Sequence, residues 1–241
     1  MVDFISTKGG GSPVAFDQAV LKGFADDGGL FVPEEIPHLS IDELQSWQSL
    51  DYIELAQNVL ARYIPSSVVP EQDLSRLLKK SFESFESEEI IPLVQPGDDP
   101  DLWIMELFHG PTLSFKDVAM GFLINILEYF LERENKRVSL ILATTGDTGP
   151  AAAYAAADME RISCWPLYPA SMITLEQELQ MTTIDAANVN PVAVAECANG
   201  GDDLDVVVAR LFDDVDIKHR LKLSSVNSIN IGRVLMQTVH Y

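Results

Sequence analysis

The fold is decided between Val138 and Asp158, where the sequence reads Val138-Ser-Leu-Ile-Leu-Ala143-Thr-Thr-Gly-Asp-Thr-Gly-Pro150-Ala-Ala-Ala-Tyr-Ala-Ala-Ala-Asp158. A short apolar run leads into a turn rich in glycine and threonine, and then into an alanine-rich stretch that opens on proline. This order predicts a buried strand, a loop and a helix.

The same rhythm extends in both directions from this stretch. Upstream, residues 102–107 form an apolar run and residues 117–134 carry apolar residues at helical spacing on a wide face, which predicts a well-buried helix. Downstream, the apolar runs 162–168 and 191–196 are separated by helical stretches. Alternating strands and helices predict an α/β fold with a parallel sheet covered by helices on both faces.

The first part of the chain has a different pattern of apolar residues. Residues 41–50, 53–64 and 71–82 show helical spacing, and a glycine turn followed by a short apolar run ends at Pro33. Residues 91–100 are rich in proline, glycine and aspartate, which marks a loop. We therefore expect a small, mainly helical amino-terminal domain over residues 1–95 and the sheet domain over residues 96–241.

Composition narrows the class of partner. The chain has 241 residues, an apolar fraction of 47% and a formal net charge of -21. Such a charge repels nucleic acid and anionic membranes, so neither is expected as a partner. No window reaches the roughly 18 apolar residues of a membrane span, and cytoplasmic residence is the expectation. Cys164 and Cys197 lack metal-ligand spacing and are expected to be buried free thiols, with no metal site.

Three loops precede predicted helices, where ligands of open α/β sheets collect. The first is His109-Gly-Pro-Thr-Leu-Ser-Phe-Lys116-Asp117, in which Asp117 is an acceptable helix start and Lys116 stands at the mouth of the helix. The positive end of a helix favours the neutral amine that a nucleophile needs. A lone lysine is nevertheless more often a solvated surface charge.

The second loop, Thr144-Thr-Gly-Asp-Thr-Gly149, and the third, Ser225-Val-Asn-Ser-Ile-Asn-Ile-Gly-Arg233, suit anions. Small and hydroxyl residues let backbone N–H groups approach an oxyanion, and an arginine in the first turns of a helix can clamp phosphate. Ser228 is expected to cap the helix that carries Arg233. Taken alone, the second loop is more often a tight turn and the third a simple helix cap.

Together the three loops resemble the threonine synthases, which are pyridoxal-phosphate enzymes of the tryptophan-synthase-β-like group. The run from Glu106 to Asp117 is similar to the family's cofactor-lysine segment, and the similarity covers essentially the whole chain. The resemblance implies that Lys116 forms a Schiff base with pyridoxal 5'-phosphate, that Phe115 lies beside the cofactor ring and that Asp147 approaches the cofactor.

The same resemblance assigns the substrate site. Thr144, Thr145, Gly146 and Thr148 would grip the substrate carboxylate, although Thr145 replaces the family's usual serine. Asn227, Ser228 and Arg233 would hold the substrate phosphate. The implied reaction converts O-phospho-L-homoserine and water to L-threonine and phosphate.

Two alternatives stay open. A phospho-lyase of the threonine-synthase-like group would release 2-oxobutyrate. The chain would instead be a non-catalytic fragment if its cofactor pocket is incomplete, because the family's Gly-Asn-Phe-Gly loop for the cofactor phosphate does not occur before Tyr241. We expect the amino-terminal portion of a longer enzyme. Nothing in the sequence predicts an oligomeric state.

Overall fold

The apolar run at residues 138–143 becomes β5 (Val138–Ala143), an inner strand of a four-stranded parallel sheet. The computed structural model describes residues 2–241. The strand order is β7-β6-β5-β8, with β6 spanning Ile162–Pro169, β7 Val192–Val194 and β8 Leu223–Ser224. Both neighbours of β5 run parallel to it, with Leu140 opposite Cys164 on β6 and Ser224 on β8.

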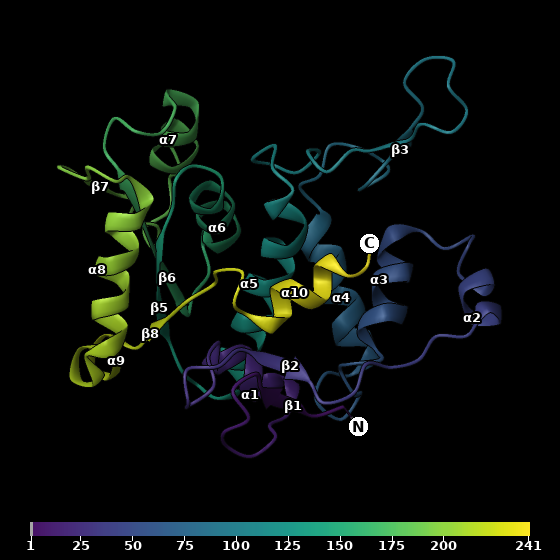
Figure 1. Cartoon of the computed structure of the whole chain (residues 1–241), viewed down its shortest axis with the longest axis horizontal. Coiled ribbons are helices and arrows are strands. Elements are labelled where there is room, and N and C mark those ends of the chain that lie inside the picture. The colour runs from purple at the N-terminus through teal and green to yellow at the C-terminus, as the bar shows by residue number, and fades with distance from the viewer. Residues whose placement is uncertain (1) are drawn as a thin grey trace.

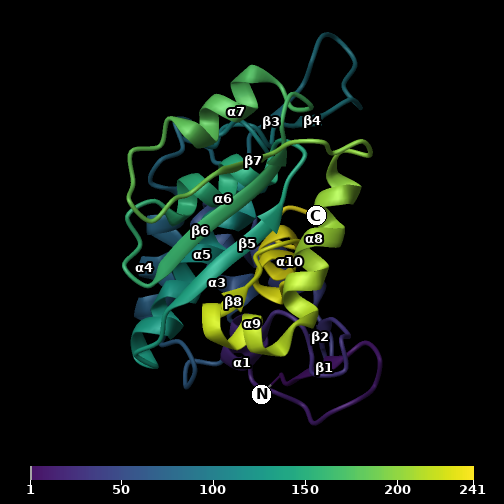
Figure 2. The same ribbon diagram turned by 90° about the vertical axis from the view of Figure 1, so that its left-hand side faces the viewer.

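Helices cover both faces of this sheet (Figures 1 and 2). Successive residues of a strand point to opposite faces, and β5 shows this directly. Leu140 and Leu142 belong to the main core, on the side of α5 (Lys116–Arg133) and α6 (Thr148–Ala156). Ile141 and Ala143 pack against a smaller core under α8 (Gly201–Asp213), which is followed by α9 (Val215–Leu221). The predicted α/β fold with a doubly covered parallel sheet is confirmed.

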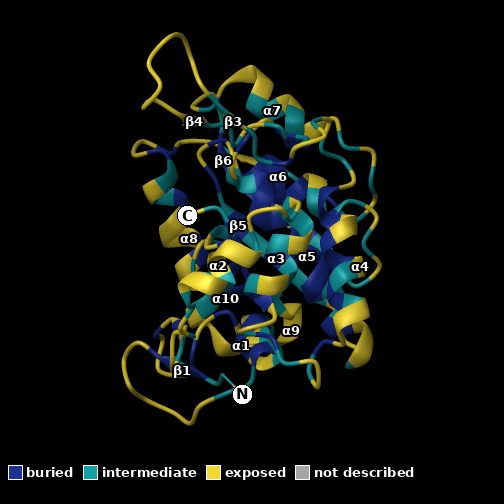
Figure 3. Cartoon of the chain, turned by 90° about the vertical axis from the view of Figure 1, so that its right-hand side faces the viewer, coloured by how far each residue is buried: buried dark blue, intermediate teal, exposed yellow. Residues whose placement is uncertain are grey.

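Helix α5 is the centre of the main core. Most of its 18 residues are buried, including Phe122, Leu123 and Ile126, as the wide apolar face predicted. It packs against α4 (Glu71–Phe82), α6 and α10 (Ile231–Gln237). Figure 3 shows α5 and α6 as largely buried, whereas α2 is largely exposed. Helix α5 is therefore packed against helices on several sides.

The amino-terminal elements are β1 (Phe4–Ser6), α1 (Phe16–Lys22), β2 (Phe31–Pro33), α2 (Ile41–Ser46), α3 (Tyr52–Leu60) and α4. The predicted helices are present, although α2 and α3 are shorter than their apolar patterns. Capping boxes at Ser40 and Asp51 set where these two helices begin. The rings of Phe16 and Phe130 lie 6.1 Å apart, so this region shares the core of α5. A domain boundary at residue 95 stays a prediction.

The apolar run 102–107 does not join the parallel sheet, so that expectation was wrong. Only β4 (Ile104–Met105) is a strand, and it pairs antiparallel with β3 (Leu93–Val94) in a separate two-stranded ribbon. A short connection permits antiparallel pairing, whereas parallel strands need a crossover of a dozen or more residues. Leu102 and Trp103 stay exposed beside this ribbon, which projects from the body of the molecule (Figure 1).

Two further expectations concern features other than the sheet. Cys164 and Cys197 are both buried and free, as predicted. Over residues 2–241, none of the helices combines the length and the apolar character that crossing a membrane would require. The remaining helix, α7 (Leu175–Thr182), packs against α6.

Candidate active site

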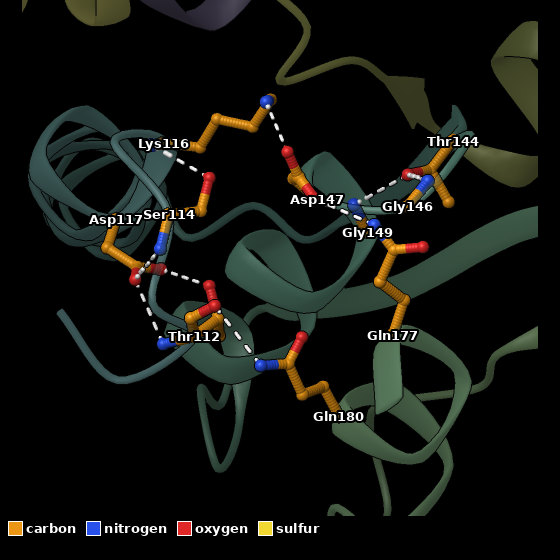
Figure 4. Close-up of polar contacts among 10 residues, drawn as sticks. All are labelled: Thr112, Ser114, Lys116, Asp117, Thr144, Gly146, Asp147, Gly149, Gln177 and Gln180. Atoms are coloured by element: carbon orange, nitrogen blue, oxygen red, sulfur yellow. Dashed lines mark hydrogen bonds and ion pairs between the residues drawn. The ribbon is translucent and has the colours of Figure 1, made fainter. Parts of the chain in front are cut away.

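The loop before α5 is held in shape by a buried carboxylate. Asp117 accepts hydrogen bonds from the backbone N–H of Thr112 at 2.9 Å, from its hydroxyl at 2.6 Å and from the N–H of Ser114 at 3.3 Å (Figure 4). Gly110 is needed here because a Cβ at that position would lie 2.4 Å from the Cβ of Asp117. Burial raises the pKa of Asp117 and outweighs these hydrogen bonds, which lower it. Asp117 thus fixes the loop from within the first turn, and the helix itself begins at Lys116.

Lys116 points from the first turn of α5 toward the second loop. Its amine donates to the carboxylate of Asp147 at 3.1 Å and lies 4.3 Å from the centre of the Phe115 ring. The side chain of Lys116 is 18% exposed. The structure therefore joins the first two loops through an ion pair, and it brings Lys116, Phe115 and Asp147 together.

Asp147 is held on both of its oxygens. One accepts from Lys116, and the other accepts from the side-chain amide of Gln177 on α7 at 2.9 Å. Burial works to raise the pKa of Asp147, but the hydrogen bonds from Lys116 and Gln177 and the charge of Lys116 outweigh it and hold the pKa below its ordinary value. The carboxylate is therefore a fixed negative charge beside the amine.

The second loop is closed by Thr144. Its buried hydroxyl oxygen accepts from the N–H of Gly146 at 3.2 Å and from the N–H of Gly149 at 2.9 Å. The N–H groups of Thr145, Asp147 and Thr148 donate to no acceptor within residues 2–241. They lie at the start of α6, where unpaired N–H groups and the helix dipole favour an anion.

Two glycines make room around this loop. Gly146 has φ +146°, and a Cβ there would lie 2.2 Å from the amide nitrogen of Gln177. A Cβ at Gly201 would lie 2.4 Å from the methyl carbon of Thr145. The threonine at 145 is therefore accommodated by the glycine at 201, at the start of α8.

The third segment follows β8, the neighbour of β5, so it leaves the sheet at the same carboxyl edge as the second loop. Its helix, α10, is capped by Asn230 and not by Ser228, which is exposed. Asn230 accepts from the N–H of Gly232 at 3.1 Å, and its amide donates to the carbonyl of Val20 on α1 at 2.9 Å. Asn230 is fully buried and bonds to both α10 and α1, so it is the helix cap in place of Ser228, which the local pattern predicted.

Arg233 lies in the first turn of α10 and is only 4% exposed. Its Nε has no hydrogen-bond partner, and no acidic side chain among residues 2–241 forms an ion pair with it. Burial lowers the pKa of its guanidinium. Buried charges are normally paired, so Arg233 is suited to an anion from outside the described chain.

Within residues 2–241, no hydrogen bond joins the third segment to either of the first two loops. No hydrogen bond or ion pair among residues 2–241 joins Asn227, Ser228 or Arg233 to Lys116. Asn227 is half-buried and lines a cleft of about 700 Å³ that also includes Phe24 and Lys218.

Sequence reasoning missed two residues of the site, Gln177 and Gln180. Both lie on α7, and Gln180 donates to the carbonyl of Thr112 at 3.1 Å. The spacing Thr174-Leu-Glu-Gln177 is a capping box, which the structure forms. That signal predicts where α7 begins, but not what the amide of Gln177 contacts.

The amino-acid sequence of this chain is similar to one family model and to several known proteins. Residues 3–82 match the family described as threonine synthase N terminus. The chain is 39% identical to the threonine synthase of Schizosaccharomyces pombe, covering 100% of this chain and 47% of that protein. It is 38% identical to threonine synthase-like 2 of Xenopus laevis, covering 99% of this chain and 49% of that protein. The chain thus spans about half the length of the curated relatives it matches.

A solved structure agrees with the fold. The PLP-bound threonine synthase from Brucella melitensis superposes with a TM-score of 0.92 at 34% identity, covering 100% of this chain and 51% of that one.

Proposed function

Because the chain belongs to the threonine synthase family, we propose that it acts in converting O-phospho-L-homoserine and water to L-threonine and phosphate, with pyridoxal 5'-phosphate carried on Lys116. Lys116 is the catalytic residue of this proposal. Phe115 and Asp147 contact the cofactor, and the substrate is held by the second and third loops.

The observation that carries the proposal is the unpaired charge of Arg233. The chain has 37 acidic residues, yet none within the described range neutralises this buried guanidinium. A guanidinium binds phosphate with two parallel hydrogen bonds. A phosphorylated substrate would therefore supply the missing charge, even though the protein as a whole repels anions.

The residues around Lys116 fit the reactive end of the cofactor. The side chain of Lys116 is only 18% exposed, its amine lies 4.3 Å from the centre of the Phe115 ring, and the amine donates to Asp147. Phe115 is 40% exposed as a residue, so it leaves an apolar surface beside the amine. When bound, pyridoxal phosphate supplies an electron sink for charge that develops on the carbons of an amino acid.

Residues of the second and third loops would bind the carboxylate and the phosphate of the substrate. The free N–H groups of Thr145, Asp147 and Thr148 would hold the substrate carboxylate at the start of α6, with Gly146 allowing close approach. The oxygen of Thr144 is already used to close the loop, so Thr144 would act by shaping that cradle. Asn227 and Ser228 would complete the phosphate site with Arg233.

Lys116 would also move protons. Its amine lies where the first and second loops meet, and it donates to Asp147 at 3.1 Å. A fixed carboxylate at that distance holds the amine in one orientation. Lys116 could thus accept a proton from one substrate carbon and return it to another without leaving its place.

A second candidate function follows from the relatives. Identity to threonine synthase-like 2 of Xenopus laevis is 38%, against 39% to the Schizosaccharomyces pombe threonine synthase. Under this alternative the chain acts in a phospho-lyase that releases 2-oxobutyrate. Both relatives match over nearly all of this chain.

Incubating the 241-residue chain with pyridoxal phosphate and O-phospho-L-homoserine tests the proposal. Released phosphate, threonine and 2-oxobutyrate are measured together, with Lys116→Ala as the control. Equal amounts of phosphate and threonine are expected. Phosphate with 2-oxobutyrate and no threonine would assign the lyase reaction instead. Absence of any Lys116-dependent phosphate release would contradict both reactions and leave a non-catalytic fragment.

A further inference from the structure

Helix α7 contacts both loops that meet at Lys116. Gln177 donates from its amide to Asp147 in the second loop at 2.9 Å, and Gln180 donates to the carbonyl of Thr112 in the first loop at 3.1 Å. The two glutamines are three residues apart, so they share one side of the helix. One short element thus holds the two loops in a fixed relation (Figure 4).

The side-chain amide of Gln177 is oriented by its hydrogen bonds with Thr174. Its oxygen accepts from the backbone N–H of Thr174 at 3.1 Å, and its own backbone N–H donates to the hydroxyl of Thr174 at 3.3 Å. Because the amide oxygen is used at the helix cap, the NH₂ group is directed toward Asp147. The capping box therefore determines which end of Gln177 reaches the site.

The second loop is built to receive this side chain. Gly146 has no Cβ, and a Cβ there would come within 2.2 Å of the Gln177 amide. Asp147 then accepts from Gln177 on one oxygen and from Lys116 on the other. The carboxylate cannot rotate without losing a bond to one of its two partners.

We propose that Gln177 and Gln180 are positioning residues: Gln177 turns Asp147 toward Lys116, and Gln180 fixes the loop that carries Lys116. The catalytic role of the Lys116 amine rests on the proposed function. The contacts themselves belong to α7 and to the two loops, and they can be tested without any ligand.

The first readout is the titration of the Asp147 carboxyl, followed by ¹³C NMR on the protein without cofactor. Lys116 on α5 is the charged group that lowers the pKa of Asp147, and the charge of Asp147 in turn raises the pKa of Asp117 on the same helix. Removing the N–H donor in Gln177→Leu is expected to move the midpoint of Asp147 upward. Gln177→Glu keeps an oxygen for the helix cap but places a carboxylate beside Asp147, so a larger upward shift is expected.

Three control variants separate positioning from general loosening. Gln180→Leu should leave the Asp147 midpoint in place. Thr174→Ala loosens the helix cap without removing the Gln177 amide, so its shift should be smaller than that of Gln177→Leu. Gln95→Leu removes a matched amide bond, from Gln95 to the carbonyl of Pro100 in the exposed ribbon, and should shift nothing.

The second readout is the rate at which Lys116 captures pyridoxal phosphate, trapped by borohydride and mapped by peptide mass spectrometry. Relative to the exposed Lys136, capture should slow about tenfold in Gln177→Leu and about threefold in Gln180→Leu. An unchanged Asp147 midpoint in both Gln177 variants would overturn the positioning role. Shifted midpoints with no selective capture at Lys116 in the unaltered protein would instead overturn the proposed function and leave the positioning contacts standing.

Discussion

The candidate site has two sides, one around Lys116 and one around Arg233, and only the first of these cations has an acidic partner in the described chain. Lys116 is paired with Asp147, and that carboxylate is fixed in turn by Gln177. Arg233 is more deeply buried, yet within the described chain no acidic side chain pairs with it and its Nε has no acceptor. The cation of the first side is paired within the described chain, whereas the cation of the second side has no partner there until an anion binds.

This difference separates two ways of preparing a reactive site. A paired amine is held in a defined place and becomes free when its hydrogen bond to the carboxylate breaks. This arrangement suits a nucleophile and a proton carrier. An unpaired buried guanidinium raises the free energy of the empty protein, and binding a phosphate removes that cost. Substitutions on the two sides should therefore have different signatures.

The largest effect is expected for Arg233→Met. The affinity for inorganic phosphate or O-phospho-L-homoserine should fall about 100-fold, because a bidentate charged contact is lost. The free energy of unfolding should rise by about 1 kcal/mol, since a buried unpaired charge is replaced by an apolar chain. Calorimetric titration and urea unfolding measure the two quantities.

Arg76→Met is the matched control for this change, since Arg76 pairs with Asp73 on the surface. It should alter neither quantity appreciably. If Arg233→Met lowered stability and left phosphate affinity unchanged, Arg233 would be a structural residue and the contrast between the two sides would fail.

A smaller effect is expected for Thr144→Val, on the internally paired side. The N–H groups of Gly146 and Gly149 lose their common acceptor in a buried place. Unfolding free energy should drop by about 2 kcal/mol, as measured in urea. Thr144→Ser keeps the oxygen and should retain most of the stability. Equal losses in the two variants would show that the methyl group, and not the oxygen, holds the loop.

The smallest expected effect is the contribution of Asp147 to the pH dependence of the free energy of unfolding. Its pKa is lowered in the folded protein, so its contribution to stability is present above the ordinary aspartate pKa and is lost as the pH falls through the folded value. The side chain is 47% exposed, and the contribution is expected to be only about 0.5 kcal/mol.

Unfolding of the protein and of Asp147→Asn should therefore differ at about pH 6 and converge below about pH 3. The exposed Asp205→Asn provides the baseline for a general change in charge. A difference that grew as the pH fell would mean that Asp147 is not stabilised in its charged form.

Sequence reasoning reached the sheet and the loops because both depend on local patterns. The run at residues 138–143 and the wide apolar face of α5 follow from side-chain periodicity, which burial enforces. The run 102–107 has a similar composition, but its short connection to β3 made it part of a ribbon. Composition alone does not identify which strand a run will pair with.

The site was predictable only in part, for a related reason. The position of Lys116 at a helix start follows from its neighbours in the sequence. Its pairing with Asp147, the reach of Gln177 across the loop and the cap at Asn230 depend on elements that meet only after folding. Ser228 fitted the local rule for a cap, but the bond from Asn230 to Val20, 210 residues away, decided the outcome.

The most direct test of the account is the absorbance spectrum of the chain titrated with pyridoxal phosphate, compared with the same titration of Lys116→Ala. Lys136→Ala, which removes an exposed lysine, is the matched control. We predict a band of lysine-bound cofactor that saturates at one equivalent in the unaltered protein and in Lys136→Ala, and that is absent from Lys116→Ala. A band of equal strength in all three proteins would contradict the central claim that Lys116 carries the cofactor.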